Sequence, residues 1–536
     1  MAALHFSGGV IWRSAGSYAK SIRVEDGVIV EIDSEAKPGD QLIDLAGAFL
    51  APAFLDGHAH PLFAGREAQG PLVNGLQSVK EILTEVKRFA DSNLNVSWII
   101  GGAYEAAIID RGDFLAEWLD EVVSDRPVVL HASDHHTIWV NSKALEIAGI
   151  GKSTSDPEGG SIERNSDGTP RGTLREPSAI NLILQHAPVR TIDEDVQAIK
   201  WACDQYLESG VTSAVDAWVE PGMAEAYIAA AKSGQLTIDM NLCFLAQPEN
   251  WRENIQYFDV LRKEIGALGK DSRLHAKTIK MIGDGALSAG TAALLQPYLD
   301  NPESSGLLIW SDEEMREAAL RFDALGYQLH IHGIGDAAVR QALDVIQFVT
   351  EMNPKWDRRP VIVHAQLIDP IDLPRFAALE VIANFQPLWT YLDPMNKDLI
   401  APRIGEERNN RQYQLASVQK SGARISYGSD WPVTSYLPLL ALAVPTHRMD
   451  PLKESAPWSI EESIPVEQSL AFYTEGVAFQ LFAGQRTGKI EIGMAADLVI
   501  LNRNPLTERP RDVAAISVLA TYKSGQLLYK NITKGA

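Results

Sequence analysis

Eight short segments rich in apolar residues recur through the middle of the chain, and stretches with helical periodicity lie between them. They occupy residues 47–58, 210–218, 236–246, 274–285, 327–333, 360–366, 380–387 and 423–432. Strands that alternate with helices pair in parallel, because each crossover helix returns the chain to the same end of the sheet. Eight is the number of strands that closes a (β/α)8 barrel. The sequence therefore predicts an α/β fold with a TIM-type barrel.

Two of the intervening stretches carry a recognisable helix start. Ser78 is followed three residues later by Glu81, and Ser311 is followed in the same way by Glu314. This spacing is typical of a capping box, in which the serine hydroxyl accepts a hydrogen bond from a backbone N–H of the first turn. We therefore expect helices to begin at both serines.

Both ends of the chain have the pattern of short strands instead. The dipeptides Asp26-Gly27 and Ser524-Gly525 separate alternating segments, as two-residue hairpin turns do. We expect residues 1–50 and 485–536 to form one small β-sandwich domain, and residues 51–484 to form the barrel. Residues of about 65–195 are expected to form a long insertion after the first barrel strand.

Polar side chains stand where several of the predicted strands end. His58 and His60 follow the first segment and, being two residues apart, share one face of a strand. The other residues of this kind are Lys280, His332, His364 and Asp430. They are far apart in the sequence, so only a closed barrel would gather them at one mouth. Imidazoles and carboxylates without thiolates suit Zn²⁺, or a harder ion such as Mn²⁺.

Each of these residues, taken singly, also has a purely structural explanation. A single histidine in a strand is more often a hydrogen-bonded core residue, and His330 fits that description as a neighbour of His332. Lys280 could extend its amine from a strand end, and Asp430 could lie in an ordinary turn. The recurrence of such residues at the same end of several strands favours a shared site.

Five segments resemble the amidohydrolase superfamily, and more narrowly its YtcJ-like branch, which includes N-substituted formamide deformylase. They are "PAFLDGHAHP", "KTIKMIGDGAL", "HIHGIGDAAVRQALD", "VIVHAQLID" and "YGSDWPV". The stretch "VLHASDHHTIWVNSKALEIAGI" and the closing "TGKIEIGMAADLVIL" extend the resemblance nearly end to end. One departure is "QPLW" at 386–389, where this branch often has a histidine in place of Trp389.

The resemblance implies one or two divalent metal ions in the barrel mouth. His58 and His60 would bind one ion together with Asp430. His332 and His364 would bind a second ion, and Lys280 would bridge the two as a carbamate formed with CO2. A single-ion site built from His58, His60, His332 and Asp430 stays an alternative.

The implied chemistry is hydrolysis of a C–N bond, in an amide or an N-acyl or N-formyl group, by metal-activated hydroxide. Asp430 is the expected catalytic residue, because a carboxylate there would carry a proton from water to the leaving amine. His136, Trp139, Asp284 and Trp431 are the residues we expect to contact the substrate. Structural alternatives are that Trp139 packs in the core of the insertion and that Asp284 caps a helix.

Two alternative functions remain open from the sequence. The first is a deaminase or cyclic-amide hydrolase on the same barrel, and the second is a non-catalytic protein of the same fold. The lysine at position 280, together with His364, favours amide hydrolysis over deamination.

Composition limits the partners of the protein. With 48 basic and 70 acidic residues the net charge is −22, which disfavours neutralising nucleic-acid phosphates. No apolar run approaches a membrane span of roughly 20 residues. Two cysteines and the lack of a signal-peptide pattern favour a cytoplasmic location. We expect a small-molecule substrate, and a homodimer is compatible with the sequence.

Overall fold

The computed structural model describes residues 2–109, 112–133, 135–157 and 159–532. The chain divides into two compact units. Unit 1 contains residues 1–60, 203–430 and 435–536, and unit 2 contains residues 61–202 with 431–434. Each unit has its own sheets.

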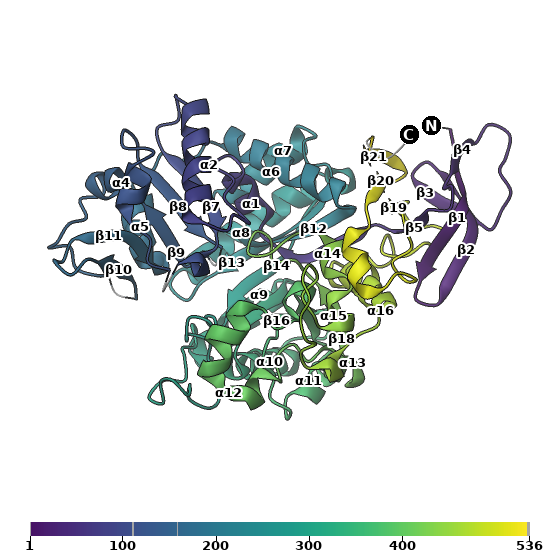
Figure 1. Cartoon of the computed structure of the whole chain (residues 1–536). Coiled ribbons are helices and arrows are strands. Elements are labelled where there is room, and N and C mark those ends of the chain that lie inside the picture. Colours follow the sequence, from purple (N-terminus) through teal and green to yellow (C-terminus); the bar gives the residue numbers. More distant parts are fainter. Residues whose placement is uncertain (1, 110–111, 134, 158, 533–536) are drawn as a thin grey trace. The chain divides into compact units, whose positions relative to one another are not determined.

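Unit 1 contains the predicted barrel. Eight parallel strands pair in the order β18-β17-β16-β15-β14-β13-β12-β6 within the described residues (Figure 1). Their bounds are β6 Phe54–Ala59, β12 Val211–Val219, β13 Asp239–Ala246, β14 Leu274–Ile282, β15 Gln328–Gly333, β16 Val361–His364, β17 Ile382–Phe385 and β18 Arg424–Tyr427. The two edge strands approach each other, and the backbone N–H of Asp430 donates to the carbonyl of His58 over 2.8 Å. The sheet is therefore a nearly closed barrel.

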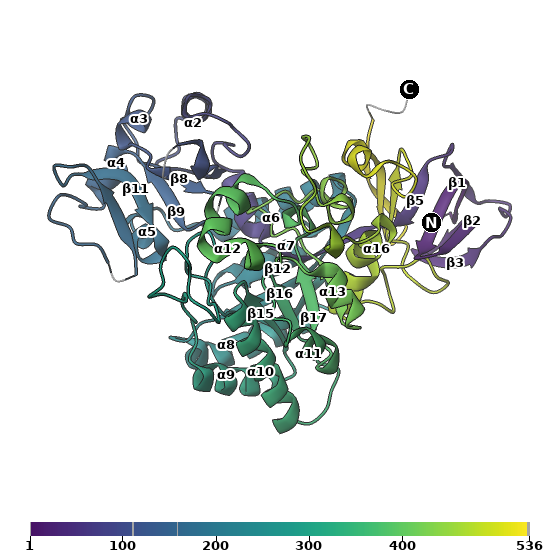
Figure 2. The ribbon, with the colours of Figure 1, turned by 60° about the horizontal axis from the view of Figure 1, so that its bottom comes forward.

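Helices follow most of the strands and cover the outside of the barrel. α7 (Met223–Lys232), α8 (Trp251–Ala267) and α9 (Asp312–Ala324) precede β13, β14 and β15. α10 (Asp336–Met352), α11 (Leu373–Ala378) and α13 (Leu415–Lys420) precede β16, β17 and β18. Figure 2 shows α9 and α10 side by side against β15. Ser311 caps α9 by accepting from the backbone N–H of Glu314, as the capping box predicts.

The first predicted segment, 47–58, is not one strand. It divides at Ala53 into β5 (Phe49–Pro52), which pairs with β1 and β19, and β6, which pairs with β12. The backbone N–H of Ala53 donates to Asp497 over 2.9 Å, so the chain passes directly from one sheet to the other there. An uninterrupted apolar run hides this change of partner, because both halves are buried.

Strands from both chain ends form a second sheet in unit 1. It has the order β21-β20-β19-β5-β1-β2-β3, with β4 beside β1. The remaining bounds are β1 Leu4–Ser14, β2 Ser17–Glu25, β3 Val28–Ile32, β4 Gln41–Asp44, β19 Leu498–Leu501, β20 Val518–Lys523 and β21 Gln526–Lys530. The purple and yellow strands of Figure 1 show this union of the two ends. The packing of this region as a β-sandwich stays a prediction.

The two hairpin turns are confirmed by their backbone angles. Asp26 and Gly27 have φ of 49° and 80°, and Ser524 and Gly525 have φ of 47° and 72°. Positive φ at both central residues is the mark of the type I′ turn, whose twist matches that of antiparallel strands. β2 pairs with β3 and β20 pairs with β21 across these turns.

Unit 2 is built on a five-stranded sheet of the order β10-β11-β9-β8-β7. The strands are β7 Ile99–Tyr104, β8 Val128–Ala132, β9 Thr137–Val140, β10 Ser161–Arg164 and β11 Pro170–Arg175. The helices are α1 Pro61–Glu67, α2 Val79–Ser92, α3 Ala116–Asp120, α4 Ser142–Ile147 and α5 Glu176–Leu184, and α6 (Ile192–Glu208) leads back to the barrel. This sheet lies between β6 and β12 in the sequence.

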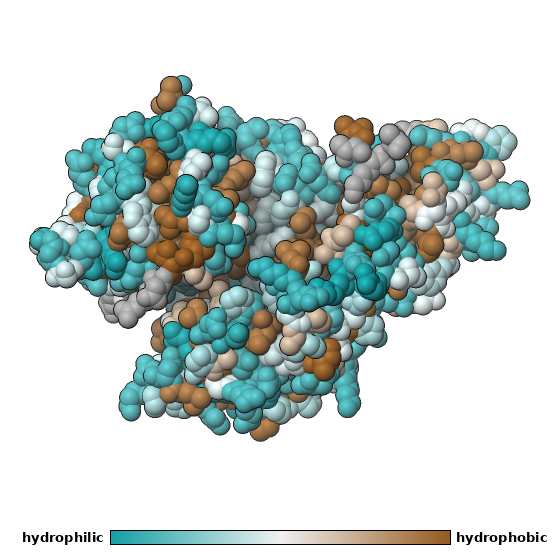
Figure 3. Space-filling model, in the orientation of Figure 1, coloured by the Kyte–Doolittle hydropathy of each residue, from teal (hydrophilic) through white to brown (hydrophobic). Residues whose placement is uncertain are grey.

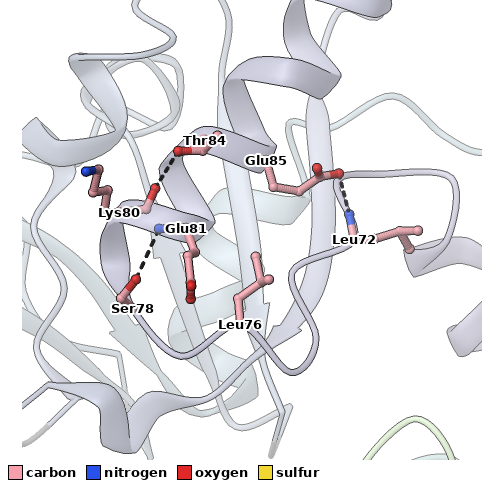
Figure 4. Close-up of a pocket in the computed structure, with 7 residues that line it drawn as sticks. All are labelled: Leu72, Leu76, Ser78, Lys80, Glu81, Thr84 and Glu85. Atoms are coloured by element: carbon pink, nitrogen blue, oxygen red, sulfur yellow. Dashed lines mark hydrogen bonds between the residues drawn. The ribbon is translucent and has the colours of Figure 1, made fainter.

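The start of α2 confirms the other predicted helix cap. The hydroxyl of Ser78 accepts a hydrogen bond from the backbone N–H of Glu81 over 3.3 Å (Figure 4). Glu81 itself accepts from the backbone N–H of Gln77 over 2.8 Å. Ser78 and Glu81 are among the residues that line a surface depression of about 460 Å³ in unit 2. Its lining contains none of the predicted site residues.

Two further observations concern the surface. The face drawn in Figure 3 is mostly hydrophilic, with apolar side chains in separate small areas. Among the described residues, the helices are all too short or too polar to cross a membrane.

Candidate metal centre

The barrel brings the first and last predicted ligands into contact. Nε2 of His60 lies 3.0 Å from Oδ1 of Asp430, and Nε2 of His58 lies 3.3 Å from the same oxygen. His58 lies in β6 and Asp430 lies three residues beyond the end of β18, so the closing of the barrel creates this cluster. His58 is 1 % exposed and Asp430 is 6 % exposed. Two imidazole nitrogens that meet one buried carboxylate oxygen have the chemistry of a cation site.

His364 joins this cluster from the end of β16. Ligand atoms of His58, His364 and Asp430 all lie within 4.8 Å of one another. His364 has a φ of 69° and Asp430 a φ of 57°, in the left-handed region that residues with a side chain rarely adopt. Such backbone strain costs on the order of 1–3 kcal/mol per residue and concentrates at functional sites.

Lys280 lies inside the barrel wall next to this cluster. It is 1 % exposed and stands opposite His330 in the β14–β15 ladder. Burial lowers the pKa of its amine to about 8, against the opposing charge of Asp430. Lys277, on the other face of β14, is exposed and lies 5.5 Å from the Phe482 ring. The alternation of the strand therefore places only one of the two lysines in the interior.

His332 ends β15 beside His364, with a ring separation of 4.8 Å. Its Nδ1 lies 3.1 Å from Oδ1 of Asp284. Asp284 also accepts from the backbone N–H groups of Ala293, Ile334 and Gly335 over 2.8–3.0 Å. A buried carboxylate with this many donors is suited to holding His332 and its loop, so substrate contact by Asp284 stays a prediction that the geometry does not favour.

Buried hydrogen bonds orient two of the candidate imidazoles. Nδ1 of His58 lies 2.9 Å from Nε2 of His330, which is fully buried, as expected of a residue behind the ligands. Nδ1 of His364 lies 2.7 Å from Oε1 of Gln386. When Nδ1 of each ring carries the proton, Nε2 offers its lone pair, which is how ligating histidines are commonly fixed.

The charge states suit a cation. Burial, aided by the charge of Lys280, lowers the pKa of His58 well below its usual value, and burial lowers that of His364 to about 3. Burial alone would raise the pKa of Asp430, but the imidazoles of His58 and His60 beside it hold that pKa well below its usual value. Neutral rings therefore face an ionised carboxylate.

The residues predicted to contact the substrate in unit 2 differ in exposure. The side chain of His136 is 46 % exposed, and its Nδ1 lies 2.9 Å from Oε2 of Glu176. Trp139 is fully buried, and its indole N–H donates to the carbonyl of Leu115 over 2.8 Å. Trp431 is 7 % exposed and packs on Trp201 at a ring separation of 5.7 Å. Burial disfavours substrate contact by Trp139, and all three assignments stay predictions.

Sequence reasoning missed the polar side chains behind the ligands. Nε2 of Gln386 donates to Asn384, which donates to Ser426 and Gln480, and Gln480 donates to the carbonyl of Gly57. Asp56 accepts four hydrogen bonds next to His58. Trp389 stacks on His364 with an interplanar angle of 3° and a ring separation of 5.3 Å. Amides within apolar strand segments were the available signal, since buried amides require partners.

Comparison with known protein families identifies the fold's relatives. A model of the amidohydrolase family matches residues 41–529. The chain belongs to the amidohydrolase family. It is 30% identical over 550 residues to the protein LONG AFTER FAR-RED 3 of Arabidopsis thaliana, covering 99% of this chain and 92% of that one. Family membership places it among hydrolases that act on carbon–nitrogen bonds other than peptide bonds, and this part of the prediction is confirmed.

Two bacterial relatives confirm the predicted branch. The putative amidohydrolase YtcJ of Bacillus subtilis is 28% identical, with 96% of this chain and 97% of that protein covered. N-substituted formamide deformylase of Arthrobacter pascens is 26% identical, with 94% and 92% covered. In structure, an uncharacterised metal-dependent hydrolase from Pyrococcus horikoshii has the same fold, with a TM-score of 0.77, 24% identity and coverage of 95% and 99%.

The cluster fits the divalent metal that this family implies. Within the described part of the chain, Nε2 of His58 is buried and has no hydrogen-bond partner, although it lies 3.3 Å from Asp430. A buried polar atom without a partner carries a desolvation cost of about 1–3 kcal/mol, which a bound cation would remove. The donor set of imidazoles and a carboxylate is the one that zinc sites use.

Proposed function

We propose that this protein is a metal-dependent hydrolase that cleaves the C–N bond of an amide, N-acyl or N-formyl compound. The observation that carries the proposal is the convergence of His58, His364 and Asp430 within 4.8 Å at the ends of three barrel strands. The relation to N-substituted formamide deformylase, over nearly the whole chain, supports the bond type. The substrate is a small molecule.

The proposed ligands are divided between two ions, of which Zn²⁺ is the favoured metal. His58, His60 and Asp430 would hold one ion, and His332 and His364 the other, with Lys280 joining them as a carbamate. Bound at this site, the metal would lower the pKa of a water molecule and polarise the substrate carbonyl. The buried position of Lys280 beside His330 supports its place in this set. With an unmodified lysine, the single-ion arrangement of His58, His60, His332 and Asp430 would apply.

The catalytic role of Asp430 follows from its place in the cluster. Its carboxylate is ionised, lies next to His58 and His60, and can accept a proton from the attacking water. The same group would then donate that proton to the nitrogen of the leaving amine as the C–N bond breaks. His136, Trp139, Asp284 and Trp431 are the proposed substrate contacts, and His136 is more exposed than Trp139 and Trp431.

The domain organisation is part of the same proposal. Residues 1–50 and 485–536 would form the small β domain, as a sandwich, and residues 51–484 the barrel with its insertion of about 65–195. The shared sheet of β1–β5 with β19–β21 supports the first part, and the compact unit of residues 61–202 supports the second. A cytoplasmic location and a homodimer stay predictions from the sequence.

The proposal is tested by metal removal followed by a substrate screen. Purified protein should contain between one and two equivalents of a divalent metal, and a chelator should abolish an activity that Zn²⁺ or Mn²⁺ restores. The screen uses N-formyl, N-acyl and cyclic amides and measures both the released amine and ammonia. Release of the amine and a carboxylic acid supports the proposal. Ammonia release alone would indicate the deaminase alternative, and the absence of any bound or restorable metal would contradict the metal-dependent mechanism.

A further inference from the structure

We propose that Asp56 is a positioning residue that fixes the distance between the ligands of the first and last barrel strands. This inference rests on the proposed function, because it concerns the spacing of His58 and Asp430 as metal ligands. Asp56 lies in β6, two residues before His58, and it is 2 % exposed. Its carboxylate accepts hydrogen bonds from the backbone of His58 and of Ser429, the residue before Asp430.

Each carboxylate oxygen of Asp56 accepts two hydrogen bonds. Oδ1 accepts from the backbone N–H of His58 over 3.2 Å and from the backbone N–H of Ser429 over 2.9 Å. Oδ2 accepts from the hydroxyl of Ser429 over 2.5 Å and from that of Tyr206 over 3.1 Å. The side chain of Asp56 thus binds both His58, which is one proposed ligand, and Ser429, which is the neighbour of the ligand Asp430. Three of its four donors belong to His58 or to Ser429, which directly precedes Asp430.

The backbone at this junction has little freedom. A side chain at Gly428 would place its Cβ within 2.6 Å of the Cβ of His58, so only glycine permits the approach of the two strands. The N–H of Asp430 donates to the carbonyl of His58 over 2.8 Å. Asp430 itself has the strained φ of 57°. The charge-assisted hydrogen bonds of Asp56 hold this strained turn against β6, because bonds to a carboxylate are about twice as strong as neutral ones.

A purely structural role is the competing explanation, and Asp216 supplies the control for it. Asp216 lies in β12, the barrel strand next to β6, and is 1 % exposed. It accepts from the hydroxyl of Tyr227 over 2.5 Å and from the backbone N–H of Trp218 over 3.1 Å. It is thus a buried aspartate with a tyrosine and a backbone partner, like Asp56, but neither Tyr227 nor Trp218 is a proposed ligand or stands next to one in the sequence.

The experiment compares Asp56→Asn with Asp216→Asn in the full chain. Zn²⁺ affinity is measured by competition with a chromogenic chelator, and thermal unfolding is measured separately in the metal-free state. Asp56→Asn should weaken Zn²⁺ binding by about 10–100-fold, the usual effect of losing a group that orients ligands. Asp216→Asn should change it by less than about threefold, even where the loss of thermal stability is equal. Equal Zn²⁺ affinity in the two variants would overturn the inference.

A milder pair of variants keeps the test valid if Asp56→Asn does not fold. Ser429→Ala removes the hydrogen bond that Asp56 accepts from the residue before Asp430. Tyr206→Phe removes the hydrogen bond that Asp56 accepts from a residue that is not next to a proposed ligand in the sequence. The first should weaken Zn²⁺ binding more than the second, and the reverse order would overturn the inference. If the unaltered protein binds no metal at all, the proposed function fails. If it binds metal and the variants match it, only the role of Asp56 fails.

Discussion

Gln386 accepts a hydrogen bond from Nδ1 of His364 over 2.7 Å, and its own amide N–H donates to Asn384. The second bond determines which end of the Gln386 amide faces His364, since the amide nitrogen is already in use. The ring of His364 therefore carries its proton on Nδ1 and presents Nε2 to the cluster. Gln386 and Asn384, which are not proposed ligands themselves, thus decide which nitrogen of His364 is available to the cluster.

Replacing Gln386 with leucine should weaken metal binding. The variant keeps the size of the side chain but removes the acceptor for His364, so that ring loses its preferred tautomer. We expect Zn²⁺ affinity to fall by about 10–100-fold. Chelator competition measures the change. Gln419→Leu is the control, because Gln419 is a glutamine of the barrel unit whose side-chain amide donates a hydrogen bond to Gln468. An unchanged affinity would show that the Gln386 bond does not matter for the site.

Asp430→Asn should abolish turnover while leaving metal largely bound. The amide can still offer an oxygen to a cation, but it cannot accept the proton that the proposed reaction moves. General acid–base groups typically contribute about 10²–10⁴-fold to rate, so kcat should fall by at least that amount. Metal content and kcat are measured on the same preparation. A variant with full activity would rule out Asp430 as the proton carrier.

Lys280 and Lys277 form a matched pair for testing the carbamate. They lie on opposite faces of β14, with Lys280 buried and Lys277 exposed. Lys280→Ala should lower the bound metal by about one equivalent, because it removes the proposed bridge, whereas Lys277→Ala should have no effect. Mass spectrometry of protein prepared with bicarbonate should find one added CO2 at Lys280. An unmodified amine, or equal metal content in both variants, would contradict the two-ion site.

Trp139→Ala distinguishes packing from substrate contact. Trp139 is fully buried among the rings of Tyr104, Phe114 and Trp118. Loss of a buried tryptophan costs about 3–5 kcal/mol, so we expect the unfolding free energy to fall by that amount. Trp118→Ala, at a partly buried neighbour, should cost less. A variant with normal stability and a raised KM would instead favour the role in substrate binding.

The stability of the protein in acid should depend on Asp239. Its carboxylate contacts the amine of Lys523 at 2.9 Å and the guanidinium of Arg486. Lys523 also donates a hydrogen bond to Asp497, and the charge of Asp239 acts on the imidazole of His275. Although burial opposes ionisation, the two cations lower the pKa of Asp239 to about 2 from 3.8. A lowered pKa stabilises the folded state above the unfolded value, and this stabilisation disappears as the pH falls from about 4 through about 2.

The comparison of Asp239→Asn with the natural chain isolates this effect. The pH-dependent part of the difference in unfolding free energy should be roughly 2 kcal/mol at neutral pH and should approach zero near pH 2. Denaturant unfolding at a series of pH values measures it. A difference that does not change between pH 5 and pH 2 would show that Asp239 has no lowered pKa.

The sequence was sufficient to predict the parallel barrel sheet, for identifiable reasons. Burial on both faces gives continuous apolar segments, and the alternation within a strand separates Lys280 from Lys277. It was insufficient where a role depends on a partner distant in the chain, as with Asp56 and Ser429 or His364 and Gln386. The division at Ala53 was also hidden, because strand pairing changes there without any change in hydrophobicity.

The pairing of β5 with β19 has a consequence for synthesis on the ribosome. β5 directly precedes the first barrel strand in the sequence. Its pairing partner β19, Leu498–Leu501, is synthesised only after every barrel strand. Until then a nascent chain presents one uncovered strand edge, the type of surface on which chains stick to one another. The sheet that begins with the amino-terminal strands is therefore completed only after Leu498–Leu501 have emerged.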